Sequence, residues 1–104
     1  MSRLFLLTIL LVLPLPAYSP GDAGAFLKAS CYSCHRGKSP AGKLDLTRLT
    51  PDVSTDSRAW SSILRRVREN EMPPSGAPAP TLDQREAFVA WLGGELKSAA
   101  CASG

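Results

Sequence analysis

The chain has 104 residues and a formal net charge of +3, from 12 Lys and Arg residues against 9 Asp and Glu. A chain of this length holds one domain at most, which excludes a multi-domain enzyme. The charge is too small to indicate nucleic-acid binding, three cysteines are too few for a disulfide scaffold, and the single histidine excludes a metal site built from several histidines.

Residues 1–21 have the pattern of a cleaved export signal. Arg3 precedes an apolar run over 4–15, and Ala17-x-Ser19 has the small residues that signal peptidase favours. Pro20 disfavours a cut after Ser19, so we expect the mature chain to begin at Asp22. A retained membrane anchor is the alternative, but about 12 apolar residues are fewer than the roughly 20 that span a bilayer.

Removal of residues 1–21 leaves 83 residues with a net charge of +2. Export predicts a periplasmic protein with no stable membrane span. A chain this small has a limited core and usually needs a metal, disulfides or a cofactor to fold. We expect one folded domain over 22–98 and a flexible tail over 99–104, where small residues predominate.

The first two predicted helices lie within residues 22–70. The first helix is expected over 22–30, with Asp22 as N-cap and with Phe26 and Leu27 buried. The second is expected over 56–70. Four apolar residues there follow the i, i+3, i+4, i+7 spacing of one buried face, namely Trp60, Ile63, Leu64 and Val67.

The third helix is predicted from Thr81, because Thr81 and Gln84 have the spacing of a capping box. We expect Gly93-Gly94 to weaken or end it, since each glycine costs about 1 kcal/mol relative to alanine inside a helix. The apolar face should hold Phe88, Trp91, Leu92 and Leu96. The stretch 43–49 is interpreted as an extended loop.

The segment Cys31-Tyr32-Ser33-Cys34-His35 is a C-x-x-C-H motif. In an exported chain this motif is typical of covalent haem attachment. Cys31 and Cys34 can each add to one vinyl group of the haem, and the adjacent His35 can bind the iron as proximal ligand. The motif therefore predicts one covalently attached haem c.

Two other interpretations of the cysteines remain open. A C-x-x-C pair can be a redox dithiol, although such pairs usually lie within a βαβ pattern that this sequence lacks. Zinc could be held by Cys31, Cys34, His35 and Cys101, although adjacent ligands such as Cys34 and His35 are closer than zinc sites prefer. If no zinc binds, Cys101 is interpreted as a tail residue with no special role.

Met72 is the predicted distal ligand of the iron, because it is the only methionine left after removal of the signal. A His and Met pair is common in cytochromes c and raises the reduction potential. Pro73 and Pro74 follow directly and stiffen the loop. The alternative is that Met72 only fills a gap in the core.

Taken together, these motifs resemble class I cytochrome c, and most closely the planctomycete-type cytochrome c domain. The resemblance covers about residues 24–97 and rests on Phe26-Leu27, Cys31 to His35, Leu44-Asp45-Leu46, Trp60, Met72-Pro73-Pro74 and Trp91-Leu92. It implies a small all-α fold with three main helices around the haem. It also implies that the first and last helices cross, so that Phe26 meets the Trp91 and Leu92 side.

The expected function is electron transfer by iron that cycles between the ferric and ferrous states. A small peroxidase-like haem enzyme is the alternative, but no second histidine is present for acid–base work. The cluster of Arg58, Arg65, Arg66 and Arg68 could dock an acidic redox partner or form a solvated helix face. Since the family's domain usually belongs to a larger exported protein, such a protein is a further candidate partner.

Overall fold

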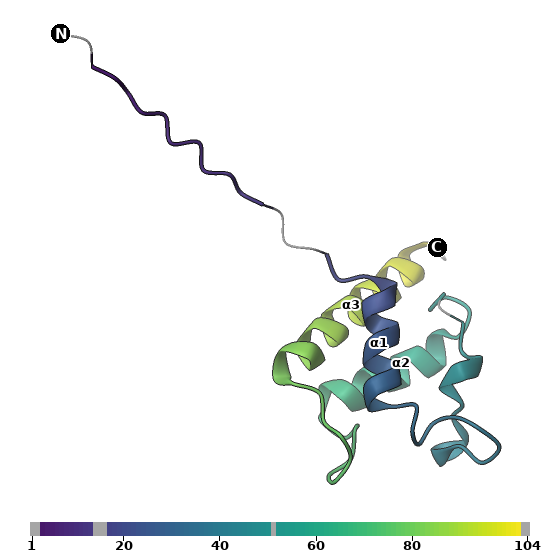
Figure 1. Ribbon diagram of the computed structural model, residues 1–104. Helices are drawn as coiled ribbons and strands as arrows, with labels where there is room; N and C mark the ends of the chain where they lie inside the picture. Colours follow the sequence, from purple (N-terminus) through teal and green to yellow (C-terminus); the bar gives the residue numbers. More distant parts are fainter. Residues whose placement is uncertain (1–2, 14–16, 51, 103–104) are drawn as a thin grey trace.

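A computed structural model describes residues 3–13, 17–50 and 52–102 of the protein (Figure 1). It contains the α-helices α1 (Pro20–Ser30), α2 (Ser57–Arg68) and α3 (Leu82–Ala102), with the short 3₁₀ helices η1 (Ala41–Lys43) and η2 (Leu46–Arg48) between α1 and α2. The described residues include no β-strand. The fold is therefore all-α, as the sequence predicts.

Helix α1 begins two residues earlier than predicted, because Ser19 and not Asp22 is its N-cap. The Asp22 N–H donates to Ser19 Oγ at 3.2 Å, and the Ser19 N–H donates to the Asp22 carboxylate at 2.8 Å. This reciprocal pair is a capping box with Asp22 at its third helical position. Pro20 is tolerated at the first helical position, where its missing N–H would have no partner in the helix.

The buried face predicted for α2 and the cap predicted for α3 agree with the structure, whereas Trp91 and Leu96 of the predicted α3 face are only half-buried. The four apolar residues of α2 are all buried. At the start of α3, the Gln84 N–H donates to Thr81 Oγ1 at 3.1 Å, and the Thr81 N–H donates to Gln84 Oε1 at 2.9 Å. The Thr81 capping box is therefore confirmed.

Helix α3 continues through Gly93-Gly94, so of the two expected outcomes an end of the helix at these glycines is wrong. Phe88 and Leu92 are fully buried, and Leu96 packs against the same core. These residues repeat every four positions, so their packing outweighs the intrinsic cost of two glycines. The helix also continues through 99–102, where the sequence predicts a flexible tail. Residues 103–104 of that tail lie outside the described residues.

The core forms where α3 packs against both α1 and α2. In Figure 1, α1 crosses α3. The Phe26 ring stacks on Phe88 with centroids 4.2 Å apart and an interplanar angle of 10°. Trp91 instead pairs with Tyr18 at 6.0 Å. The ring contact of Phe26 thus lies about one turn earlier on α3 than the resemblance implies.

The stretch 43–49 is not simply extended, because it contains part of η1 and all of η2. The Asp45 carboxylate caps η2 by accepting a hydrogen bond from the Thr47 N–H at 2.9 Å. Leu46 is buried, and its N–H donates to the His35 carbonyl at 2.8 Å. The loop therefore folds back onto the residues that follow α1.

Residues 3–13 have no regular secondary structure and extend away from the helices (Figure 1). Their large apolar side chains are exposed, as for Phe5 at 87%. No helix among the described residues is long and apolar enough to cross a membrane. Residues 1–2 and 14–16 of the predicted signal lie outside the described ranges.

Candidate functional site

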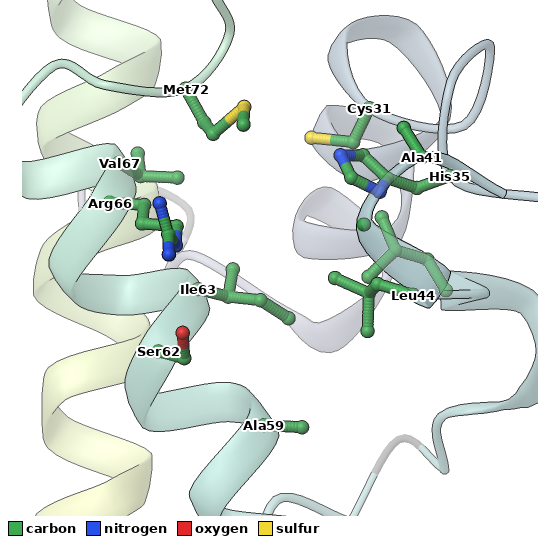
Figure 2. Close-up of a pocket in the computed structure, with 12 residues that line it drawn as sticks. Cys31, His35, Ala41, Leu44, Ala59, Ser62, Ile63, Arg66, Val67 and Met72 are labelled. Carbon is green, nitrogen blue, oxygen red and sulfur yellow. The ribbon is translucent and has the colours of Figure 1, made fainter.

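A cavity of about 430 Å³ lies between α2 and the segment that follows α1 (Figure 2). This volume falls within the range of about 300–1,000 Å³ that is typical of pockets for small molecules and cofactors. The lining is mainly apolar. It consists of Ala59, Ser62, Ile63, Arg66 and Val67 from α2, of Cys31, His35, Ala41, Gly42, Leu44 and Leu46 from the facing segment, and of Met72.

A tight turn after α1 carries Cys31 and His35 to this cavity. The N–H groups of Cys34 and His35 both donate to the Cys31 carbonyl, at 3.3 and 3.1 Å. The turn continues the helical path, and residues four apart lie on one side of such a path. Cys31 and His35 therefore line the cavity together.

Cys34 is placed differently from the other predicted site residues. Its side chain is exposed, lies 3.8 Å from Ser33 Oγ and is not part of the cavity lining. Cys31, by contrast, is half-buried, and neither thiol is in a disulfide. The structure thus brings three of the four predicted residues to one cavity and leaves the fourth on the adjoining turn.

The electrostatics of Cys31 disfavour the redox-dithiol interpretation. Burial raises the pKa of the Cys31 thiol to about 11, and the nearby Cys34 contributes in the same direction. A reactive dithiol needs a lowered pKa, because the thiolate is the nucleophile. The Cys31 thiol is instead protonated at neutral pH.

The structure does not support zinc binding by Cys31, Cys34, His35 and Cys101. Cys101 is exposed near the end of α3. In the part of the chain that the structure describes, no group of three or more His, Cys, Asp or Glu side chains could hold a metal ion. Cys101 is therefore not gathered with Cys31, Cys34 and His35.

Met72 reaches the cavity because the chain reverses at the end of α2. Asn70 adopts a left-handed conformation with φ of 61°, which short polar residues tolerate after a helix. The N–H groups of Glu71 and Met72 then both donate to the Arg66 carbonyl, at 2.9 and 3.2 Å. This reversal holds Met72 beside the last turns of α2.

Met72 and His35 lie on opposite walls of the cavity. Figure 2 shows the Met72 thioether on the α2 side and the His35 imidazole, next to Cys31, on the other side. The His35 Nδ1 atom is buried and has no hydrogen-bond partner among the described residues. Trp60 is buried in the core and does not line the cavity.

One residue at this site was missed by the sequence analysis. Arg85 Nη1 donates to the carbonyl of Val67 at 3.0 Å and to the carbonyl of Met72 at 2.9 Å. The available signal was its position, because a cation near a helix N-terminus opposes the helix dipole and needs another reason to be there. Arg85 stands at the fourth residue of α3.

Comparison with protein families finds a match to the model described as planctomycete cytochrome C, over residues 31–76. This match agrees with the resemblance that the sequence indicates and covers the segment from the C-x-x-C-H motif to just beyond Met72. The matched segment contains Cys31, Cys34, His35 and Met72. Comparisons with curated proteins and with solved structures give no significant match.

Cytochrome c domains use haem, and the residues at the cavity fit this cofactor. An imidazole and a thioether face each other across the cavity, and this ligand pair is the one that cytochromes c use. The mainly apolar lining suits a porphyrin, and Cys31 lies on the same wall as His35. The exposed Cys34 follows on the same turn.

Proposed function

We propose that the protein is an exported monohaem cytochrome c that transfers single electrons between redox partners. The observation that carries the proposal is the opposition of the His35 imidazole and the Met72 thioether across one mainly apolar cavity. Haem c, when bound, supplies the iron whose ferric and ferrous states carry the electron.

Four side chains of the chain would hold the cofactor. Cys31 and Cys34 would form the two thioether bonds to haem c. His35 would be the proximal ligand and Met72 the distal ligand of the iron. Because Met72 is a thioether donor, it would favour the ferrous state and so raise the reduction potential.

An electron carrier fits this cavity better than a haem enzyme. A peroxidase-like enzyme needs an open iron position and an acid–base group beside it. The described lining contains no carboxylate, and His35 is the only histidine of the chain. Occupation of both axial positions by His35 and Met72 would leave no position for a substrate.

Export is supported by the exposed apolar segment over 3–13. Such a contiguous apolar surface is unusual on a soluble protein and marks a site that meets a membrane or another protein. A signal peptide held by the export machinery explains it. We therefore place the mature protein in the periplasm.

The partners would be redox proteins with an acidic docking surface. Arg58, Arg65, Arg66 and Arg68 are all exposed, and only Arg66 has an ion-pair partner among the described residues, Glu71 at 3.3 Å. Arg58 and Arg65 are seven residues apart, about two turns, and lie beside the cavity-lining Ser62. Helical spacing puts Arg68 on another side of α2. We therefore limit the docking surface of this protein to Arg58, Arg65 and Arg66.

The decisive experiment is expression together with a cytochrome c maturation system. Haem should remain on the chain through acid–acetone extraction and denaturing electrophoresis, and the reduced-minus-oxidised spectrum should show a c-type cytochrome. Replacement of both Cys31 and Cys34 by Ala should abolish this, whereas Cys101→Ala is the matched control and should not. Complete extraction of haem from the unaltered protein would refute covalent attachment, and a colourless protein would refute the proposed function.

A further inference from the structure

Arg85 joins two helices at the point where Met72 enters the cavity. Its Nη1 atom donates to the carbonyl of Val67, in the last turn of α2, and to the carbonyl of Met72 itself. The side chain is partly buried. Hydrogen bonds from a charged donor in such a place are stronger than those between neutral groups.

The backbone of Met72 is held from both sides. Its N–H donates to the Arg66 carbonyl at 3.2 Å, which attaches it to α2. Its C=O accepts from Arg85, which attaches it to α3. The next two residues are Pro73 and Pro74, and neither has an N–H that could fix the loop in another way. Arg85 is therefore the attachment on the C-terminal side of Met72.

We propose that Arg85 is a positioning residue that holds the Met72 thioether toward the haem iron. The inference rests on the proposed function, in which Met72 is the distal ligand. With the carbonyl fixed by Arg85 and the N–H fixed by Arg66, the Cα–Cβ bond of Met72 has one direction, into the cavity. Loss of Arg85 frees the carbonyl and weakens the bond between the thioether and the iron.

The test compares three variants of the haem-loaded protein. Arg85→Met keeps most of the aliphatic volume and removes both hydrogen bonds. Arg85→Lys keeps a charged donor that can reach a carbonyl. Arg68→Met is the matched control, because Arg68 is exposed and does not line the cavity. The readouts are the sulfur-to-iron charge-transfer band of the ferric protein, the affinity for added imidazole, which competes with Met72, and the thermal midpoint.

We expect Arg85→Met to weaken the charge-transfer band and to bind imidazole about tenfold more tightly, the fold-change that corresponds to one charge-assisted hydrogen bond. Arg85→Lys should recover part of the band, and Arg68→Met should match the parent. In the Met72→Ala background no ligand remains to be positioned, so Arg85→Met should leave imidazole affinity unchanged, as a double-mutant cycle requires.

Two results would overturn the inference. A lower thermal midpoint in Arg85→Met with an unchanged band and unchanged imidazole affinity would make Arg85 a structural tether only. Equal effects of Arg85→Met in the parent and in Met72→Ala would show that it acts on something other than Met72. If the parent itself lacks the charge-transfer band, the proposed ligation by Met72 has failed, which is a different result from either of these.

Discussion

In the proposed haem protein, Met72 would decide whether the iron only carries electrons or also offers an open ligand position. We expect Met72→Ala to abolish the sulfur-to-iron band, to admit water or cyanide, and to lower the reduction potential, since a thioether favours ferrous iron. Met72→His should restore low-spin iron but keep the potential low. Visible spectra and redox titration measure both effects.

The competing interpretation of Met72 as a packing residue predicts something else. Met72→Ala would then cost about 2–5 kcal/mol of unfolding free energy and leave the spin state unchanged. An unaltered ferric spectrum in this variant would remove Met72 from the site and favour a peroxidase-like function.

The sequence predicts the residues of the site better than the contacts that hold them. Cys31 and His35 belong to one short motif, and Met72 follows by elimination, so all three could be named without a structure. The position of Arg85 near the start of a helix is a signal in the sequence, but its contacts could not be predicted, because its partners are backbone carbonyls 13 and 18 residues away. Every residue has a main-chain carbonyl, so the sequence does not show which carbonyl accepts a hydrogen bond.

Within α3, Gly94 offers a test of why the helix continues past two glycines. A Cβ at Gly94 would meet no atom within 4 Å. We therefore expect Gly94→Ala to raise the free energy of unfolding by about 0.5–1 kcal/mol, measured by urea denaturation. A Cβ at Gly93 would meet Leu64 Cδ2 at 3.9 Å, an ordinary contact, so Gly93→Ala should also be tolerated. Destabilisation by Gly94→Ala would contradict this account.

The start of α1 bears on where the export signal is removed. A cut before Asp22 would remove Ser19, one half of the capping box, at a cost of about 1 kcal/mol, and would remove the contact of Tyr18 with Trp91. A cut after Ala17 would preserve both and follow a small residue, although the third residue before the cut would then be Leu15, which is not small. We therefore predict a mature chain that begins at Tyr18, to be checked by mass spectrometry of the periplasmic protein.

A chain that begins at Asp22 would contradict the predicted cut after Ala17. An intact N-terminus on membrane-bound protein would show that the segment is an anchor. The sequence alone favours Asp22 because Pro20 disfavours a cut after Ser19. Only the reciprocal hydrogen bonds of Ser19 and Asp22 show that the helix begins before the predicted cut.

At the scale of the molecule, the stack of Phe26 on Phe88 joins the first helix to the last. Phe88 is 0% exposed. Phe88→Ala should therefore cost about 3–5 kcal/mol, a large fraction of the stability of a domain this small. Thermal unfolding of the haem-loaded protein measures the loss. An effect below about 1 kcal/mol would mean that the two helices are held together elsewhere.

The proposed docking surface predicts that substitutions at two arginines of α2 change the rate of electron transfer to different extents. Arg58→Glu and Arg68→Glu change the net charge equally, but only Arg58 belongs to the proposed docking surface. We expect Arg58→Glu to slow reaction with the anionic oxidant ferricyanide about tenfold at low ionic strength, and Arg68→Glu to slow it much less. Stopped-flow kinetics at several salt concentrations measure this. Equal slowing would mean that only net charge matters.

Helix α2 packs against the core on one side and lines the cavity on another. Trp60 and Leu64 belong to the core, Ala59 and Ser62 line the cavity, and Val67 belongs to both. Local opening of α2 would break its core contacts and remove one wall of the cavity, so its amide hydrogens should exchange slowly with solvent. A molecule bound at the cavity would therefore slow hydrogen exchange across α2 and the facing side of α3, well beyond the atoms that it contacts.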